Sequence, residues 1–141
     1  MLKDTDTTAH ILPIRVYYED TDAGGIVYYA NYMKYFERAR TEWLRNLGIS
    51  QKKLAHQENT IFVVKKSEID YLKPAKLDDL IKIQSKIIHL GAASLVFLQK
   101  AELNETILCQ SNTVVVCVNS KTMRPKKLNP TIRAILKKVQ V

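Results

Sequence analysis

Three carboxylates fall within four residues, at Glu19, Asp20 and Asp22, and two glycines follow directly at Gly24 and Gly25. Crowded like charges raise the electrostatic energy of a loop, so this cluster is unusual for a purely structural turn. A carboxylate can attack a carbonyl carbon directly, or it can activate a water molecule that does so. The glycines allow the backbone to approach a ligand closely, or they simply form a turn. The segment is therefore a candidate site for chemistry at a carbonyl group.

A helix is predicted directly after this segment, over residues 31–47. Its apolar residues recur at helical spacing, at Met33, Phe36, Trp43, Leu44 and Leu47. Asn31 is the expected N-cap, and Gly48 stands where a glycine often ends a helix. The free N–H groups of a helix N-terminus stabilise negative charge. This placement suits a reaction in which a carbonyl oxygen becomes an oxyanion.

The remaining elements must position these two features. Alternating apolar residues predict strands over residues 12–18, 61–71, 80–90, 94–103 and 106–119. A short helical turn is expected at 51–56, a terminal helix is expected around 132–139, and residues 1–10 are expected to be loosely attached. Short connections between strands imply antiparallel neighbours. The order predicts an α+β fold in which a five-stranded antiparallel sheet wraps around one long central helix.

Length and composition fit one domain over residues 1–141, with 46% hydrophobic residues. No apolar run approaches the ~20 residues of a transmembrane helix. The polar start of the chain does not resemble a secretory signal, so we expect a cytoplasmic protein. Cys109 and Cys117 fall in one predicted strand, roughly 26 Å apart at ~3.3 Å per residue, so they are expected to be free thiols. No metal-ligand spacing is present, and no cofactor is expected.

The net charge of +8 is concentrated at the C-terminal end. Residues 119–141 hold no acidic side chain and seven basic ones: Lys121, Arg124, Lys126, Lys127, Arg133, Lys137 and Lys138. This segment could meet the phosphates of coenzyme A, an acidic carrier protein or, weakly, an anionic membrane surface. It could equally be a solvated face that only aids solubility. Nucleic acid is disfavoured because no binding motif accompanies the charge.

The motif at residues 20–32 (DTDAGGIVYYANY), continued by 36–40 (FERAR), resembles the signature of hotdog-fold acyl-CoA thioesterases. Further similarity lies at residues 62–66 (FVVKK), 74–79 (PAKLDD) and 94–97 (SLVF). The resemblance is to the 4-hydroxybenzoyl-CoA thioesterase-like family and, within it, to the Tol–Pal-associated (YbgC-type) branch. It covers nearly the whole chain, and it implies the hotdog fold and hydrolysis of acyl-CoA.

The resemblance implies roles for individual residues. Asp22 occupies the place of the family's catalytic carboxylate, although an aspartate there could also merely cap a turn. The backbone N–H of Tyr29 is expected to polarise the thioester oxygen, while its side chain could line the acyl pocket or simply pack. Asp20 is expected to support the loop. The residues expected to contact substrate are Gly24, Gly25, Val27, Tyr28, Ser94, Arg124, Lys126 and Lys127.

Two departures from the family pattern shape the expectation. The YbgC-type branch usually has histidine where this chain has Tyr29, whereas the aryl-CoA branch has tyrosine there. Related aryl-CoA enzymes carry basic residues just before the position of Ser94, where this chain has Gly91 and two alanines. The C-terminal cations Arg124, Lys126 and Lys127 are therefore the better candidates for binding phosphate.

The leading hypothesis is an acyl-CoA thioesterase that works without metal or cofactor on short- to medium-chain or aryl acyl groups. A second hypothesis is a thioesterase for acyl groups on acyl carrier protein, docked through the basic segment. A third is a non-catalytic module that binds acyl thioesters, which Asp22 argues against. By resemblance we expect a homodimer, or a dimer of dimers forming a tetramer, with sites at the subunit interface.

Overall fold

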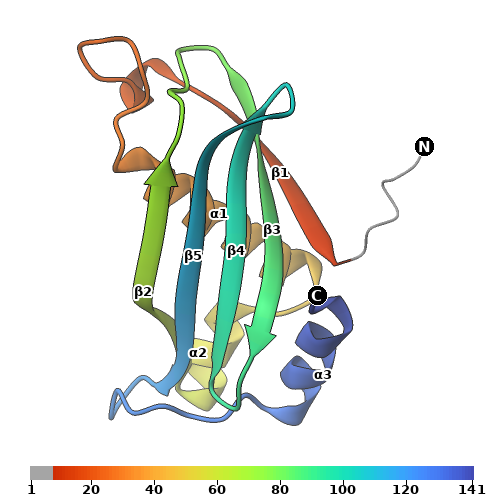
Figure 1. The fold of residues 1–141 in the computed structure, drawn as a ribbon. Helices are drawn as coiled ribbons and strands as arrows, with labels where there is room; N and C mark the ends of the chain where they lie inside the picture. Colours follow the sequence, from red (N-terminus) through yellow and green to blue (C-terminus); the bar gives the residue numbers. More distant parts are fainter. Residues whose placement is uncertain (1–7) are drawn as a thin grey trace.

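The computed structural model describes residues 8–141 (Figure 1). Its five strands are β1 (Ala9–Arg15), β2 (Thr60–Tyr71), β3 (Leu80–Leu90), β4 (Ser94–Leu103) and β5 (Thr106–Asn119). They form one sheet in the order β1-β3-β4-β5-β2, and every neighbouring pair is antiparallel. The five predicted strands and their antiparallel pairing are therefore confirmed, and β2 lies at one edge of the sheet.

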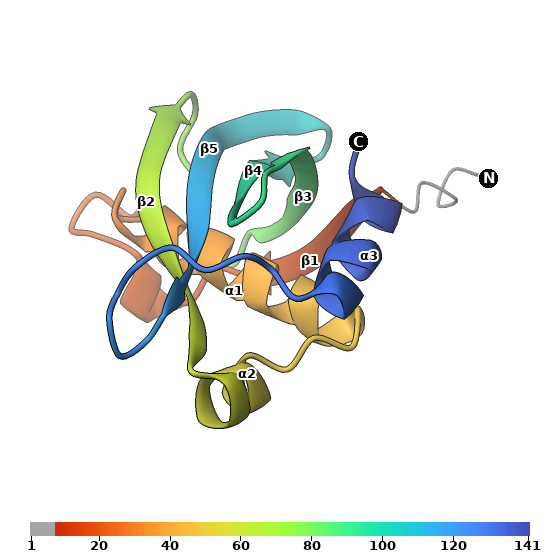
Figure 2. The same cartoon turned by 90° about the horizontal axis from the view of Figure 1, so that it is seen from below.

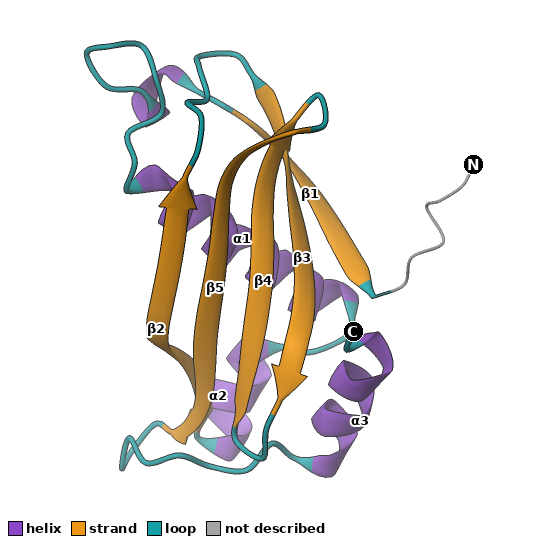
Figure 3. Ribbon diagram, viewed as in Figure 1, coloured by secondary structure: helices purple, strands orange, loops and turns teal. Residues whose placement is uncertain are grey.

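The helices are α1 (Asn31–Asn46), α2 (Gln51–Glu58) and α3 (Pro130–Val139), and a short 3-10 helix, η1, covers Tyr18–Asp20. Figure 3 shows α1 lying across one face of the sheet, and Figure 2 shows the strands curling over it. The other two helices lie toward the C-terminal end of α1. This arrangement confirms the predicted α+β class and the hotdog architecture.

The sheet buries the apolar side of α1. Its buried side chains are Tyr32, Tyr35, Phe36, Ala39, Trp43 and Leu44. Strand β4 faces them with alternating residues, of which Leu95, Phe97 and Ala101 are apolar and Gln99 is polar. Gln99 donates through Nε2 to the Phe36 carbonyl at 2.9 Å and to Ser85 Oγ at 3.0 Å. A buried amide that bonds both elements thus holds α1 against the middle of the sheet.

Two details at the N-terminal side differ from the sequence prediction. The first strand ends at Arg15 rather than residue 18, because the backbone of Val16 turns to pair with the segment before β3. Val16 N–H donates to the Asp79 carbonyl at 2.8 Å, and Asp78 N–H donates to the Val16 carbonyl at 3.0 Å. The expected loose segment lies mostly in residues 1–7, outside the described residues, but Ala9 and His10 belong to β1.

The expected N-cap at Asn31 is also wrong. Asn31 is the first helical residue, and Ala30 precedes it as an N-cap without a side-chain hydrogen bond. The Asn31 side chain instead donates through Nδ2 to the Asp20 carbonyl at 2.8 Å. Asn31 therefore connects the helix to the acidic loop.

The predictions for the residues after α1 that concern α2 and the two cysteines are confirmed. The short helical turn expected at 51–56 is the full helix α2, which Ser50 caps by accepting from Lys53 N–H at 3.2 Å. Cys109 and Cys117 are free, buried thiols on β5, as expected. Within residues 8–141, no helix is both long and apolar enough to cross a membrane.

Candidate active site

The segment that follows η1 folds back on itself in a tight loop. Asp22 N–H donates to the Ile26 carbonyl at 2.9 Å, and Gly25 N–H donates to the Asp22 carbonyl at 3.0 Å. Thr21 and Val27 face each other across an antiparallel bridge. Gly25 has φ of 80°, in the left-handed region that only glycine adopts at little cost. The second glycine of the motif is therefore required by the turn itself.

This loop presents the Asp22 side chain to solvent. Gly24 N–H donates to Asp22 Oδ1 at 2.8 Å, which fixes one carboxylate oxygen on the loop backbone. A methyl group added at Gly24 would lie 3.2 Å from the same oxygen, so the first glycine leaves room for the carboxylate. Among residues 8–141, no hydrogen bond engages Oδ2. Asp22 thus both caps the turn, as aspartate commonly does, and keeps one oxygen open for chemistry.

Asp20 has the supporting position expected for it. Its carboxylate accepts from Tyr17 N–H at 2.8 Å, and its carbonyl accepts from Tyr28 N–H at 2.9 Å and from Asn31 Nδ2 at 2.8 Å. These bonds join the end of β1, the loop and the start of α1. Asp20 therefore sets the position of the Asp22 loop relative to the helix.

The helix start carries backbone donors that are not used within the chain. The N–H groups of Asn31, Tyr32 and Met33 donate to carbonyls three residues earlier, the shortest bond being 2.8 Å from Asn31 to Tyr28. Among the described residues, the N–H groups of Tyr29 and Ala30 have no acceptor. Such free donors at a helix N-terminus are the groups that stabilise an oxyanion. The Tyr29 amide is therefore free to accept such a role, which stays a prediction.

A row of tyrosine rings runs from this point toward the core. The ring of Tyr29 lies 4.8 Å from that of Tyr28 and 5.9 Å from that of Tyr71, measured between centroids. Tyr71 lies 5.8 Å from Tyr32, which in turn lies 5.9 Å from Tyr35. Burial raises the pKa of Tyr32 and of Tyr71, so both phenols stay protonated at neutral pH.

These rings border a cavity of about 250 Å³. It is lined by Ile26, Val27, Tyr29, Tyr32, Tyr71, Leu72, Lys73 and Pro74. The predicted substrate residue Val27 and the Tyr29 side chain both border it, although only 5% of Val27 is exposed. Tyr28 is half-exposed beside it. An apolar cavity next to a free amide and an open carboxylate can hold an acyl group.

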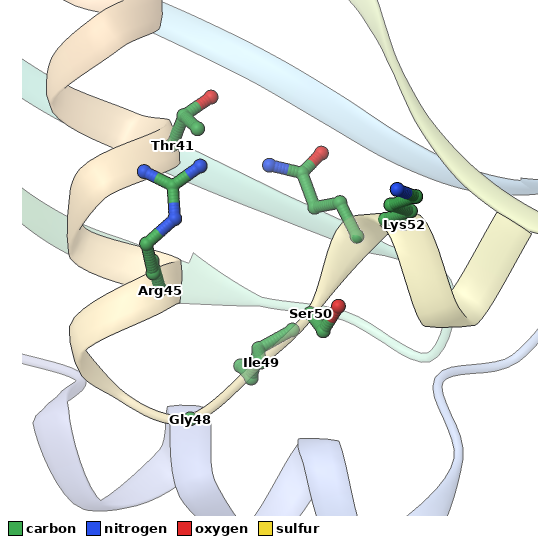
Figure 4. Close-up of a pocket in the computed structure, with 7 residues that line it drawn as sticks. Thr41, Arg45, Gly48, Ile49, Ser50 and Lys52 are labelled. Carbon is green, nitrogen blue, oxygen red and sulfur yellow. The ribbon is translucent and has the colours of Figure 1, made fainter.

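A larger hollow of about 380 Å³ lies elsewhere (Figure 4). It is lined by Thr41, Arg45, Gly48, Ile49, Ser50, Gln51 and Lys52. These residues surround the C-terminal end of α1, at the opposite end of the helix from the acidic loop. None of them is a predicted site residue, and the helix start at this hollow, that of α2, is capped by the Ser50 side chain, which accepts from Lys53 N–H. We therefore place the candidate site at the start of α1 despite the larger size of this hollow.

The remaining predicted substrate residues lie far from Asp22 within one chain. Ser94 begins β4, and Arg124, Lys126 and Lys127 lie in the segment after β5, both at the end of the sheet opposite the acidic loop (Figure 1). Lys126 Nζ donates to the Glu58 carbonyl at 2.5 Å and to Thr60 Oγ1 at 2.8 Å, whereas Arg124 and Lys127 are exposed. One chain therefore does not bring these residues to the loop.

Sequence reasoning missed six of the residues that line this cavity, namely Ile26, Tyr32, Tyr71, Leu72, Lys73 and Pro74. Tyr71 and Leu72 stand at the end of β2 and Pro74 follows them, and all three line the cavity beside Tyr29. The aromatic end of a predicted strand was the available signal. It could not place that end beside the start of α1, because the pairing of β2 with β5 sets its position.

Residues 24–110 match the family model described as "Thioesterase superfamily". The chain belongs to the thioesterase superfamily. It is 45% identical over 133 residues to the acyl-CoA thioester hydrolase YbgC of Escherichia coli O6:H1, covering 94% of this chain and 98% of that protein. It is 43% identical over 122 residues to the acyl-CoA thioesterase YbgC of Haemophilus influenzae, covering 86% and 90%.

The solved structures agree with this assignment. The crystal structure of a probable thioesterase from Bartonella henselae has a TM-score of 0.81 and 33% identity, covering 85% of this chain and 98% of that one. The predicted membership of the thioesterase family, the hotdog fold and the class of thioester hydrolase are thus confirmed. The Tol–Pal association stays a prediction.

The buried tyrosines of this thioesterase make a first testable pair. Tyr32 Oη accepts from Ala75 N–H at 3.3 Å, so Tyr32→Phe leaves a buried donor unpaired. We expect it to lower the free energy of unfolding by about 1–3 kcal/mol in urea titrations at neutral pH. Tyr35 Oη lies near the Asp20 carboxylate, but no hydrogen bond of good geometry engages it among the described residues. Tyr35→Phe should therefore cost less than ~1 kcal/mol, and an equal loss in both variants would contradict this difference.

The same pair predicts a pH dependence. Burial, helped by the Asp20 carboxylate, raises the pKa of Tyr35 above its ordinary value of 10.0. The stability from this raised pKa is complete below 10.0 and is lost as pH rises above it. Urea titrations should therefore show that the free energy of unfolding falls less steeply with rising alkaline pH in Tyr35→Phe than in wild type. If the free energy of unfolding falls equally steeply with pH in both proteins, Tyr35 ionises as freely in the folded chain as in the unfolded one.

Proposed function

We propose that this thioesterase hydrolyses acyl-CoA thioesters, of short- to medium-chain or aryl acids, to the free acid and coenzyme A. The observation that carries the proposal is the free backbone N–H of Tyr29 at the start of α1, directly after the loop that presents Asp22. The Tyr29 N–H can stabilise the developing negative charge on the carbonyl oxygen, and the Asp22 carboxylate can supply or activate the attacking oxygen. The names of the relatives, acyl-CoA thioester hydrolase and acyl-CoA thioesterase, support coenzyme A as the carrier.

In the proposed reaction the thioester oxygen accepts from Tyr29 N–H, so the carbonyl carbon becomes more electrophilic. A preorganised donor of this kind is commonly worth about 3–4 kcal/mol of barrier. The positive end of the α1 dipole adds to this stabilisation. The acyl group occupies the cavity beside Tyr29 and Tyr71, and the Gly24–Gly25 turn lets the backbone approach the thioester.

Asp22 can act by either of two routes, as a nucleophile or as a general base. As a nucleophile, its open oxygen bonds to the carbonyl carbon, the C–S bond breaks, and the products are a mixed anhydride and the coenzyme A thiolate, which water then protonates. A second water cleaves the anhydride. As a general base, Asp22 takes a proton from the attacking water and returns it to the departing thiolate. Both routes give one acid and one thiol, without a cofactor.

In this proposal the basic residues after β5 reach the site only when two copies of the chain form a dimer. Strand β2 is an edge strand, and pairing the edges of two copies would remove an exposed row of backbone groups. A two-fold antiparallel pairing of β2 would set the basic end of one copy beside the acidic loop of the other. Arg124 and Lys127 would then reach the phosphates of coenzyme A bound at the partner's Asp22. We propose this homodimer, alone or paired again into a tetramer, as the active form.

The exposed charge also keeps a second candidate open. An acyl carrier protein is acidic, and the same exposed Arg124 and Lys127 could dock it in place of coenzyme A. A non-catalytic binding module is less well supported, because a binder gains little from the open Asp22 carboxylate. The cytoplasm is the proposed compartment, and the two free thiols support a reducing one.

Asp22→Asn tests the proposed chemistry. The amide oxygen can still accept from Gly24 N–H, so the loop should keep its shape while the nucleophile or base is lost. We expect kcat for acyl-CoA hydrolysis to fall at least ~10²-fold, while a non-hydrolysable acyl-CoA analogue still binds. Glu19→Gln, an exposed carboxylate just before the loop, is the matched control and should keep the wild-type rate. Wild-type activity in Asp22→Asn would refute the assignment.

Single-turnover hydrolysis in ¹⁸O-labelled water then separates the two routes. Label that enters the Asp22 carboxylate indicates an anhydride, whereas label found only in the product acid indicates an activated water. Release of thiol from a panel of acyl-CoA and acyl carrier protein substrates identifies the carrier.

The basic segment is tested by charge reversal. Arg124→Glu with Lys127→Glu should raise KM for acyl-CoA several-fold with little change in kcat, since phosphate contacts far from the carbonyl bind substrate and transition state equally. The KM of the variant should also depend less on salt. Lys137→Glu with Lys138→Glu, exposed residues of α3, makes the same charge change elsewhere and is the control. An equal KM in all three proteins would leave the segment as a solvated face.

Assembly is tested by light scattering and by mixing. We expect a dimer or tetramer in solution, and an active, monodisperse monomer would contradict the proposal. If each site joins Asp22 of one copy to the cations of the other, mixed dimers of Asp22→Asn and the Arg124→Glu, Lys127→Glu variant contain one intact site. Activity at low substrate should then exceed the mean of the two separate variants. A strict mean would indicate that each site uses its own chain's cations or none.

A further inference from the structure

A partly buried cation, Arg40, lies between α1 and the sheet, away from the residues assigned so far. Arg40 borders two small hollows between α1 and the β2–β5 side of the sheet, of about 110 and 120 Å³. The walls of both hollows are mainly apolar. They include Leu44, Phe62, Leu95 and Val115 in one, and Met33, Phe36 and Ile69 in the other. Arg40 and Val64 border both hollows, so the Arg40 side chain is accessible from each.

Few groups balance this charge. Arg40 Nη1 donates to Gln99 Oε1 at 3.0 Å, and the guanidinium carbon lies 5.9 Å from the centroid of the Phe97 ring. Among the described residues, no carboxylate lies within ion-pair distance of it, the pairs found being Arg45–Glu42 and Lys66–Glu68. Burial lowers the pKa of Arg40, and the charge of Glu37 partly opposes this.

Glu37 lines one of the two hollows together with Arg40 and acts on its charge, but its carboxylate is already engaged. Its carboxylate accepts a hydrogen bond from Thr41 Oγ1 on the same helix. A guanidinium has five N–H donors. Among the described residues, the one side-chain hydrogen bond that Arg40 donates is to Gln99. A poorly compensated cation in a partly buried position is costly, and an anion bound beside it would offset that cost.

The helix connects this cation to the reacting centre. Met33, Phe36 and Arg40 follow one another at the i, i+3, i+7 spacing of a single helix face. From Asn31 to Arg40 the helix rises about 14 Å, at ~1.5 Å per residue. An acyl group whose carbonyl accepts from Tyr29 N–H would begin in the cavity beside Tyr29 and Tyr71, and a chain long enough to continue past it along this face would bring its far end to the guanidinium.

We propose that Arg40 binds the far end of the acyl group and that the preferred substrates carry a carboxylate there. The substrate class is the half-thioester of a medium-length dicarboxylic acid with coenzyme A. A terminal carboxylate would supply the anion that Arg40 lacks, in the planar two-point geometry that guanidinium groups favour. The inference rests on the proposed acyl-CoA hydrolysis and adds a determinant of acyl specificity to it.

The test compares two coenzyme A thioesters of equal chain length, one ending in a carboxylate and the other in a methyl group. In wild type, kcat/KM should favour the carboxylate-ended substrate by about tenfold or more, the scale of one hydrogen bond to a charged group. Arg40→Met, which keeps the length and apolar stem, should abolish or invert this preference. Arg40→Lys should retain part of it, because the charge stays while the planar fork is lost.

Gln99→Met separates recognition from packing. It removes the Arg40 acceptor and the link between α1 and the sheet but leaves the cation in place. A merely structural Arg40 would make Arg40→Met and Gln99→Met lower the rates for both substrates alike, with the preference unchanged, and this would overturn the inference. If Arg40→Met does not fold, the wild-type ratio decides: equal rates or a preference for the methyl-ended substrate would refute it. Hydrolysis of neither substrate would instead refute the proposed function.

Discussion

The candidate site depends on the hydrogen bonds that converge on Asp20. Its carboxylate holds Tyr17 N–H, and its carbonyl holds Tyr28 N–H and Asn31 Nδ2. Three segments that could otherwise move independently are thereby fixed around one residue. Because Asn31 is tied to this carbonyl, α1 begins at a set distance from the loop. The open Asp22 carboxylate and the free Tyr29 amide are therefore positioned by a residue that need not touch a substrate.

The same constraint explains why α1 can begin without a side-chain cap. An Asn, Ser or Asp at the N-cap normally satisfies one of the free amides at a helix start. Here Ala30 occupies that place, and the amides of Tyr29 and Ala30 stay unpaired within the described chain. A capping side chain at position 30 would accept from the N–H of Tyr32 or Met33, and both already donate to carbonyls three residues earlier, so the helix start lacks little without it. The local loss in helix stability is offset by the deep burial of α1 against the sheet.

Sequence patterns predicted the elements well because each carries its own periodicity. The alternation in β3 and β4 and the stripe on α1 reflect one apolar face each, and the Asn104–Glu105 turn adopts the positive φ angles of 49° and 69° expected of a two-residue hairpin. Arg15 as the end of β1 was not predictable in this way. It depends on Val16 pairing with Asp78 and Asp79, which lie some sixty positions further along the chain.

The candidate site was only partly predictable for a similar reason. Asp22 and the Gly24–Gly25 turn are local, and the family resemblance named them directly. Tyr71 reaches the site through the register of β2 against β5, where it pairs with Cys109. Arg40 was not predicted at all, because a helical stripe shows which side is apolar but not that Arg40 bonds Gln99 on β4.

The middle of the molecule shows how one polar contact can serve both fold and site. Gln99 is fully buried, and it bonds Phe36 on the helix, Ser85 on β3 and the Arg40 guanidinium. An apolar side chain at this position would pack as well but would leave the cation with less compensation. The hydrogen bond from Arg40 to Gln99 therefore partly compensates the charge of the guanidinium. Arg40 in turn bonds Gln99 and lies 5.9 Å from the Phe97 ring centroid, so the same pair joins the packing of α1 to the proposed recognition of the far end of the substrate.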